Sequence, residues 1–208
     1  YLTHTTLYHA NTDKVKAALV AERMREITTY SFITGKAIET LNLSAEDPRR
    51  QAITLLNPLG EEYSTLRTQL VTSMLTVLAT NASRKIPAVR FFELSKRFVA
   101  KSLPLTEQPD EIPVLCLGLY GEGEDFFTLK GAVEAILKEI RAVDIHFEGP
   151  TGAPSDASWH PGRVATVWSG SDCIGIFGQI HPLVAQNYGV DAELYCAELS
   201  FDELMLAK

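Results

Sequence analysis

The sequence predicts an α+β fold in which helices flank an antiparallel β-sheet. Strand-like segments at residues 163–168, 173–180 and 194–199 follow one another at the spacing of hairpins. Helical patterns lie between other strands at irregular intervals, whereas a doubly wound parallel fold would need strict alternation of strand and helix. With 208 residues, of which 46% are hydrophobic and 22% charged, the chain can bury the core of one large mixed domain.

The N-terminal region is expected to form a helix and two strands. Polar residues 11–13 offer capping side chains ahead of a helical segment. Residues 27–33 are β-branched and aromatic, which is typical of a strand. Residues 41–50 form a polar connection, and residues 52–56 are the second strand candidate.

A turn and a long amphipathic helix are predicted next. Asn-Pro-Leu-Gly at residues 57–60 favours a turn, and Glu61 and Glu62 suit the first turn of a helix. Apolar residues then recur at helical spacing up to about Arg84: Leu66, Leu70, Met74, Val77 and Leu78. The helix is therefore expected to present one apolar face.

The middle of the chain combines strands with the clearest helix. Residues 89–94 and 97–100 look like two halves of a strand or hairpin, and the Pro- and acid-rich residues 102–113 are the best candidate for a mobile loop. A strand is expected at residues 114–120. Asp125 can cap a helix whose apolar positions match the 3.6-residue period: Leu129, Val133, Ile136, Leu137 and Ile140. A short strand at 145–147 and a Gly/Pro/Ser loop at 149–158 complete the pattern.

Charge and hydropathy exclude two classes of partner. The chain has 19 basic and 26 acidic residues, a formal charge of −7, and no basic stripe with interleaved aromatic residues. Direct grip on a nucleic-acid backbone is therefore not expected, because such binding depends on concentrated Lys and Arg. No window approaches the roughly 18 apolar residues of a membrane span. Since no secretory signal is visible either, the sequence predicts a cytoplasmic protein with no membrane contact.

The cysteines and histidines do not form a metal-binding pattern. Cys116, Cys173 and Cys196 each lie in an apolar, strand-like run without Cys-x-x-Cys spacing, so buried reduced thiols are expected. The histidines show no ligand spacing with one another or with these thiols. No metal site is predicted.

Five stretches of the chain resemble the beta subunit of phenylalanyl-tRNA synthetase: NPLGEEYSTLRTQL at residues 57–70, VRFFELSKRF at 89–98, FFTLKGAVE at 126–134, WHPGRVA at 159–165 and the strand and His-Pro turn at 174–183. The resemblance covers most of the chain. It implies a class II aminoacyl-tRNA synthetase-like fold, which agrees with the antiparallel sheet predicted above. It also implies that residues 1–208 are a single catalytic-like domain, a fragment of a larger beta subunit.

Two departures from an active class II site predict that the domain is inactive, with no catalytic or cofactor-binding residue of its own. In the active motif an arginine and a glutamate lie one residue apart, whereas Arg90 and Glu93 are three positions apart and point to opposite faces of a strand. The glycine-rich stretch at 175–182 lacks the arginine of the second ATP-binding element. Little positive charge is thus available to a triphosphate.

The same resemblance suggests two non-catalytic sites. In class II enzymes the long helix belongs to the dimerisation motif, so a subunit interface is expected at Leu66, Arg67, Leu70 and Met74. His160 is best explained as a turn residue bonded to nearby backbone. The alternative is a polar pair of His160 and Arg163 at an interface or in a vestigial pocket, for which Arg90 and Glu93 are the other candidates.

The resemblance also implies the partners. The parent enzyme would attach phenylalanine to tRNA(Phe) with ATP and magnesium, with the chemistry in the alpha subunit of a two-alpha, two-beta tetramer. This domain would pack on the alpha subunit, tRNA would be held by other domains, and a homodimer could form in isolation. Two alternatives remain at this point: a small-molecule binding module derived from a synthetase core, and an active adenylate-forming ligase.

Overall fold

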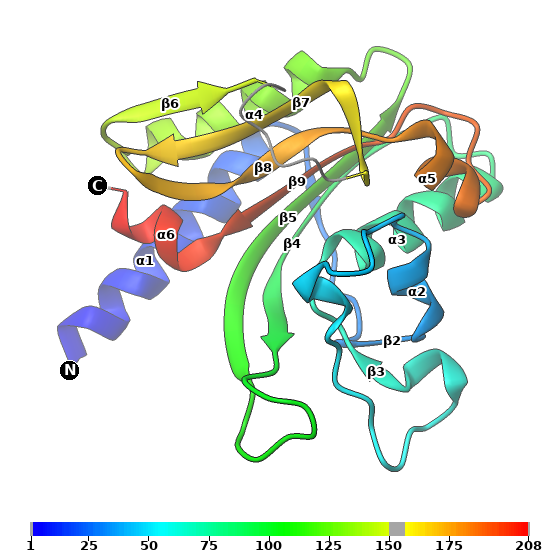
Figure 1. The fold of residues 1–208 in the computed structure, drawn as a ribbon. Coiled ribbons are helices and arrows are strands. Elements are labelled where there is room, and N and C mark those ends of the chain that lie inside the picture. Colours follow the sequence, from blue (N-terminus) through cyan, green and yellow to red (C-terminus); the bar gives the residue numbers. More distant parts are fainter. Residues whose placement is uncertain (1, 150–156, 208) are drawn as a thin grey trace.

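A seven-stranded sheet organises the structure (Figure 1). The computed structural model describes residues 2–149 and 157–207, with side chains from residue 8 onward. Every neighbouring pair in the sheet is antiparallel except the first, which is parallel. In spatial order the strands are β1 (Arg25–Glu26), β4 (Ala88–Val99), β5 (Asp110–Gly121), β9 (Tyr195–Ser200), β8 (Asp172–Ile180), β7 (Trp159–Ser169) and β6 (Ile145–Glu148).

The remaining elements cover the two faces of this sheet. Strands β2 (Phe32–Ile33) and β3 (Thr65–Leu66) pair in a separate small sheet, and short 3₁₀ helices occupy Pro48–Arg50 and Glu61–Tyr63. The α-helices are α1 (Leu2–Ala21), α2 (Lys36–Glu39), α3 (Val71–Ser83), α4 (Phe126–Glu139), α5 (Pro182–Asn187) and α6 (Phe201–Leu206). The predicted α+β class, with an antiparallel sheet between helices, is confirmed.

Alternation along the central strand β5 divides the core in two. Leu115, Leu117 and Leu119 belong to the cluster formed with α1, α4 and α6. Val114 and Cys116 point the other way, into the cluster formed with α3 and α5. Since both faces are covered, β5 is apolar almost throughout and shows little of the alternation of a half-exposed strand.

Strands β4 and β5 form one long hairpin. They pair without interruption from Ala88 opposite Gly121 to Val99 opposite Asp110. The two halves predicted around residues 89–100 are thus one strand. The predicted loop at 102–113 was too long, because residues 110–113 belong to β5. Their acidic character is that of an exposed strand end, where Glu111 forms an ion pair with Lys96 at 2.8 Å.

Four predictions in the N-terminal half were wrong in extent. Residues 11–13 lie inside α1 and do not precede a helix. The strand expected at 27–33 is β2 alone, and the one expected at 52–56 is a single bridge between Thr54 and Thr65. The long helix starts at Val71, so Leu66 lies in β3. Local apolar spacing cannot reveal that residues 65–70 bond to other segments before the helix begins.

Helix α4 and the C-terminal strands agree with the predictions. Asp125 caps α4 by accepting a hydrogen bond from the backbone N–H of Thr128 at 2.7 Å. Strands β7, β8 and β9 are antiparallel, as the hairpin spacing predicted. Most of the predicted loop at 149–158 lies outside the described residues. Within residues 2–149 and 157–207, no helix has both the length and the hydropathy of a membrane span.

The close approach of β7 to β8 requires glycine at position 178. A Cβ there would lie 2.7 Å from Cα of Val164 and closer still to the carbonyl oxygen of Arg163, which are backbone atoms that cannot move aside alone.

Gly178→Ala should lower the free energy of unfolding by about 1–3 kcal/mol. Urea denaturation measures this. Gly131→Ala in α4 is the control, where a Cβ meets nothing within 4 Å and the expected change is a gain of up to about 1 kcal/mol.

Candidate functional site

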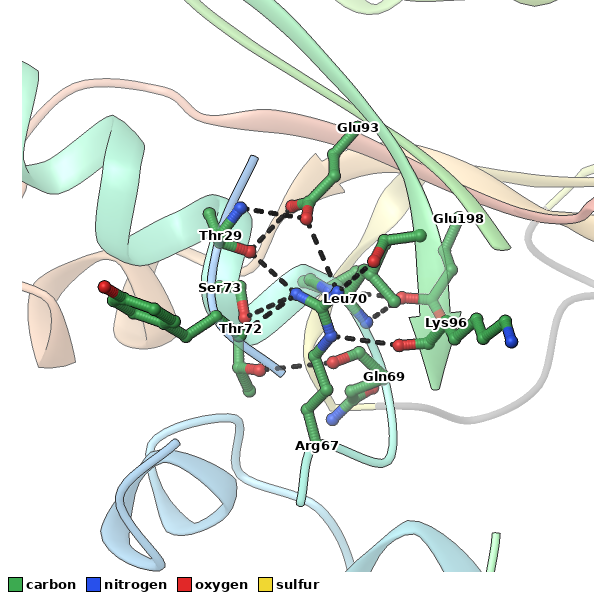
Figure 2. A network of polar contacts seen from close by, with 12 residues as sticks. Thr29, Arg67, Gln69, Leu70, Thr72, Ser73, Glu93, Lys96 and Glu198 are labelled. Atoms are coloured by element: carbon green, nitrogen blue, oxygen red, sulfur yellow. Dashed lines mark hydrogen bonds and ion pairs between the residues drawn. The ribbon is translucent and has the colours of Figure 1, made fainter. Parts of the chain in front are cut away.

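Two carboxylates lie in one transverse row on the α3 face of the sheet. In register, Glu93 of β4 is opposite Cys116 of β5, which is opposite Glu198 of β9. Because side chains in register point to the same face, both carboxylates face the segment that leads into α3, with one strand between them (Figure 2). Two like charges in a covered part of the fold need separate partners.

Arg67 is the partner of Glu93. Its guanidinium Nη2 lies 3.4 Å from Glu93 Oε1, and the two side chains are 0% and 2% exposed. The same guanidinium donates to the Lys96 carbonyl at 3.0 Å, to Thr29 Oγ1 at 2.7 Å and to Ser95 Oγ at 2.6 Å (Figure 2). Arg67 is thereby bonded within the chain on several sides, as a buried charge must be.

Thr29 completes the environment of Glu93. The carboxylate accepts from the backbone N–H of Thr29 at 3.0 Å and from its hydroxyl at 2.7 Å. After one backbone bond, from the N–H of Ile27 to the Phe92 carbonyl at 2.9 Å, the segment before β2 is attached to β4 through the Glu93 side chain and not through a continued strand ladder. This explains why the β-rich sequence at 27–33 forms so little regular strand.

Glu198 is held by the start of α3. Its Oε2 accepts from the backbone N–H groups of Leu70 at 2.9 Å and Val71 at 3.1 Å, and its Oε1 lies 3.9 Å from Arg97 Nη1. Burial raises the pKa of Glu198, and the charge of Arg97 and the two N–H groups oppose that rise. The carboxylate satisfies N–H groups that the first turn of a helix leaves unpaired.

The residues predicted as a vestigial pocket do not line one cavity. Arg90 pairs with Glu124 at 2.9 Å on the face opposite Glu93, which confirms that the two point in opposite directions. Arg163 of β7 donates to Glu193 at 2.8 Å and to Gln179 at 2.7 Å. Arg90 and Arg163 line separate cavities of 470 and 670 Å³, so the structure does not bring this residue set into one cavity.

His160 has the local role expected of it, with one difference. Its Nδ1 accepts a hydrogen bond from the backbone N–H of Gly162 at 3.1 Å, a bond to nearby backbone. The segment is the irregular start of β7 rather than a turn, because the register with β8 shifts between Trp159 and Val164.

The residues predicted for a subunit interface are mostly interior. Leu70 and Met74 are 0% exposed and belong to the core on the α3 face, and Arg67 is equally buried. Only Leu66 keeps partial exposure. Because they are buried, Leu70, Met74 and Arg67 cannot contact a partner directly. The subunit interface stays a prediction, and it requires more exposed residues than these.

Neither a metal-ligand cluster nor an activated thiol is found among the described residues. No three His, Cys, Asp or Glu side chains in residues 2–149 and 157–207 gather as ligands of a metal ion. Burial raises the pKa values of Cys116 and Cys196, which disfavours their thiolates. Cys173 is exposed, contrary to the expectation that all three thiols are buried. Neither β8–α5 nor β9–α6 carries an arginine at its strand-to-helix junction.

No local pattern in the sequence indicates the polar network. Its partners are separated by up to 128 positions along the chain. Thr29, Ser95 and Glu198 were not predicted as members, because hydroxyls and single carboxylates in strands are common. Only the sheet register brings Glu93 and Glu198 into one row.

Removing the charge of Glu93 should destabilise the fold strongly. Glu93→Gln leaves the buried Arg67 guanidinium without its counter-ion, which should lower the free energy of unfolding by about 3–5 kcal/mol. Urea denaturation followed by circular dichroism gives the value. Glu111→Gln is the matched control, since its pair with Lys96 is about half exposed on both sides and the midpoint should stay close to that of the parent chain. Equal effects of the two substitutions would contradict a buried, coupled pair.

Stability should depend on pH through Glu198. Because its pKa is raised, the folded state holds the proton more tightly than the unfolded chain does. The contribution of this group to the unfolding free energy is therefore largest at low pH and falls as pH rises above about 4.5. Glu198→Gln keeps an acceptor for the α3 N–H groups and removes the titration. Its stability relative to the parent should increase as pH rises above about 4.5, and a difference that is constant with pH would refute the shift.

Comparison with known proteins places this arrangement in context. Residues 3–201 match the family model described as the phenylalanyl tRNA synthetase beta chain CLM domain. The chain is 32% identical over 192 residues to the phenylalanine–tRNA ligase beta subunit of Clostridium tetani, covering 92% of this chain and 24% of that protein. It is 34% identical over 203 residues to the one from Symbiobacterium thermophilum, covering 92% and 22%. The chain thus spans about a quarter of the length of these curated relatives.

A solved structure shows the same fold at low sequence identity. The pyrrolysyl-tRNA synthetase of Desulfitobacterium hafniense superposes with a TM-score of 0.75 and 14% identity, over 96% of this chain and 68% of that one. This likeness concerns the fold alone, which is that of class II synthetases.

Proposed function

Because the chain belongs to the phenylalanyl-tRNA synthetase beta-chain family through its CLM domain, we propose that it is a non-catalytic, structural domain that packs on the catalytic alpha subunit and supports ATP-dependent phenylalanylation of tRNA(Phe). The observation that carries this proposal is the inward use of charge. Arg67, Glu93 and Glu198 bond to groups of the same chain, with Arg67 and Glu93 almost fully buried.

The described residues do not suit the ATP and magnesium of the parent reaction. A triphosphate needs guanidinium or ammonium groups that are free to reach it. Arg67 is buried in its network, and Arg90 is paired with Glu124 on the other face of the sheet. The cavity that Arg97 lines has a volume of only 290 Å³, which is too small for a nucleotide. We assign ATP and magnesium to the alpha subunit of the holoenzyme. With a formal charge of −7 on this chain, we also assign the grip on tRNA to other domains, in a cytoplasmic enzyme.

A surface for the alpha subunit is available around the loop that precedes β3. Leu56 and Leu59 are 97% and 93% exposed, and Tyr30 is 72% exposed. The Tyr30 ring packs edge to face on Tyr63 with centroids 5.5 Å apart, which joins the loop to the segment before β2. In Figure 1 this cyan loop projects at the lower end of the molecule. Exposed apolar groups gathered in one region are typical of protein–protein contacts.

This surface differs from the one predicted from the sequence. The motif at residues 57–70 contributes its exposed Leu59, whereas its C-terminal part is buried and shapes the core. The same leucines would account for a homodimer of the isolated domain, in which a second copy substitutes for the missing subunit.

The test uses the full-length beta chain co-expressed with its alpha subunit. Leu56→Ser combined with Leu59→Ser should weaken assembly at least about tenfold, because each buried leucine contributes about 1.5–3 kcal/mol. Light scattering over a concentration series after size exclusion measures the dissociation constant. Leu183→Ser is the control, since Leu183 is 56% exposed on α5. Unchanged assembly of the double variant would show that this loop is not the contact.

A further inference from the structure

We propose that the chain binds a small organic carboxylate with an apolar body in a cavity between the sheet and the segment that precedes α3. The cavity has a volume of 290 Å³. Its polar wall includes Gln69, Arg97 and Glu198, and its apolar wall includes Val114, Trp159 and Ile176. The proposal does not depend on packing against an alpha subunit, since it rests on groups inside this chain.

Gln69 presents a hydrogen-bond donor that nothing accepts among the described residues. The residue is 3% exposed. Its Oε1 accepts from Arg49 Nη1 at 3.3 Å, which fixes the orientation of the amide, because an Nε2 in that place would oppose the guanidinium. Its Nε2 is buried and has no partner in the described part of the chain. Buried donors in folded proteins are normally paired, so this group indicates an acceptor in the cavity.

Arg97 is the second unsatisfied donor. Its Nε is buried without a hydrogen-bond partner among the described residues, and its side chain is 33% exposed. The nearest carboxylate, that of Glu198, lies 3.9 Å from Nη1, beyond hydrogen-bond distance. The other arginines that are no more exposed each donate hydrogen bonds to protein groups: Arg49, Arg50, Arg67 and Arg90.

These two donors define the chemistry of the ligand. A guanidinium that offers Nε and Nη in one plane matches the two oxygens of a carboxylate. An ammonium ion does not fit beside these groups, because it can only donate hydrogen bonds and Gln69 and Arg97 both offer N–H donors there. Glu198, the cavity's carboxylate, already accepts from the backbone of Leu70 and Val71. The ligand's acceptor group therefore belongs beside Arg97 and Gln69.

The apolar wall and the volume limit the rest of the ligand. Trp159 is 4% exposed and Val114 is 1% exposed, so this side of the cavity is well covered. A volume of 290 Å³ is at the lower end of the roughly 300–1,000 Å³ of small-molecule sites. It suits a body of about the size of one ring or a branched alkyl group, and it is too small for a nucleotide.

The experiment titrates the purified chain with phenylacetate, with acetate and with the neutral isostere phenylacetamide. Calorimetry measures affinity, and the ¹⁵N–¹H signals of the Gln69 side-chain amide report on the site itself, assigned by their loss in Gln69→Met. We expect saturable binding of phenylacetate that shifts these signals, with acetate and phenylacetamide at least tenfold weaker. Equal affinity for acetate would overturn the apolar body, and equal affinity for phenylacetamide would overturn the carboxylate.

Variants at Arg97 complete the test. Arg97→Met retains length and should weaken phenylacetate binding at least tenfold, and Arg97→Lys, which keeps the charge and loses the planar fork, should also weaken it. Arg163→Met is the control, since Arg163 lies on β7 and does not line this cavity. A urea curve of each variant confirms folding. No saturable binding to the parent chain, or binding that both Arg97 variants retain, would overturn the proposal, whatever the result for subunit assembly.

Discussion

Residues 67–71 hold two carboxylates of the central sheet at once, and the arrangement of the α3 face depends on this contact. The side chain of Arg67 binds Glu93, and the backbone N–H groups of Leu70 and Val71 bind Glu198. The carboxylates lie in one row on β4 and β9, with β5 between them, so a single short segment spans these three strands. Helix α3 begins where the second carboxylate caps it, and its Met74 and Leu78 then pack over Gly118. Both the bonds to Glu198 and the packing over Gly118 thus hold the helix in position.

The energetics of this contact explain what it contributes. A buried ion pair returns little net stability, because removing both charges from water costs about as much as their attraction gains. Its main effect is to disfavour alternative packings of the chain, because any packing that separates Arg67 from Glu93 leaves a buried charge unpaired. Thr29 and Ser95 add bonds that only one geometry satisfies. We therefore regard the network as the feature that selects one packing of the N-terminal segments on the sheet, which suits a domain whose role is to present a fixed surface.

The sequence predicted the parts of the fold that depend on local pattern. Helix α4 has a cap at Asp125 and a regular apolar period, and β7, β8 and β9 pair antiparallel as their spacing predicts, although α5 lies between β8 and β9. It failed where long-range bonds replace local ones. Leu66 and Leu70 fit a helical period, yet the backbone N–H of Arg67 bonds to the Ser31 carbonyl and holds residues 65–67 out of the helix. The burial of Arg67 was equally hidden, since an arginine after a turn normally reaches water.

The same reasoning applies to the candidate sites. The opposite orientation of Arg90 and Glu93 followed from strand geometry alone and is confirmed. The grouping of Arg90 with Arg163 came from resemblance, which carries no information on distance, and the structure separates them. The cavity beside Arg97 had no local pattern at all, because its walls come from five strands and segments far apart in the chain.

The network and the cavity share one strand. Glu93, Ser95 and Arg97 follow at every second position of β4 and so point to the same face. Arg67 binds Glu93 and Ser95, and Arg97 follows two positions later, at the cavity wall. On the far side of the row, Glu198 bonds to the start of α3 and faces Arg97. Arg67 thus bonds to the β4 side chains that precede Arg97, and the start of α3 bonds to the carboxylate opposite Arg97. Ion pairs with carboxylates of the chain occupy five other arginines: Arg49, Arg50, Arg67, Arg90 and Arg163. The Nε of Arg97 is buried without a hydrogen-bond partner among the described residues, and the strand ladder places this guanidinium at the cavity.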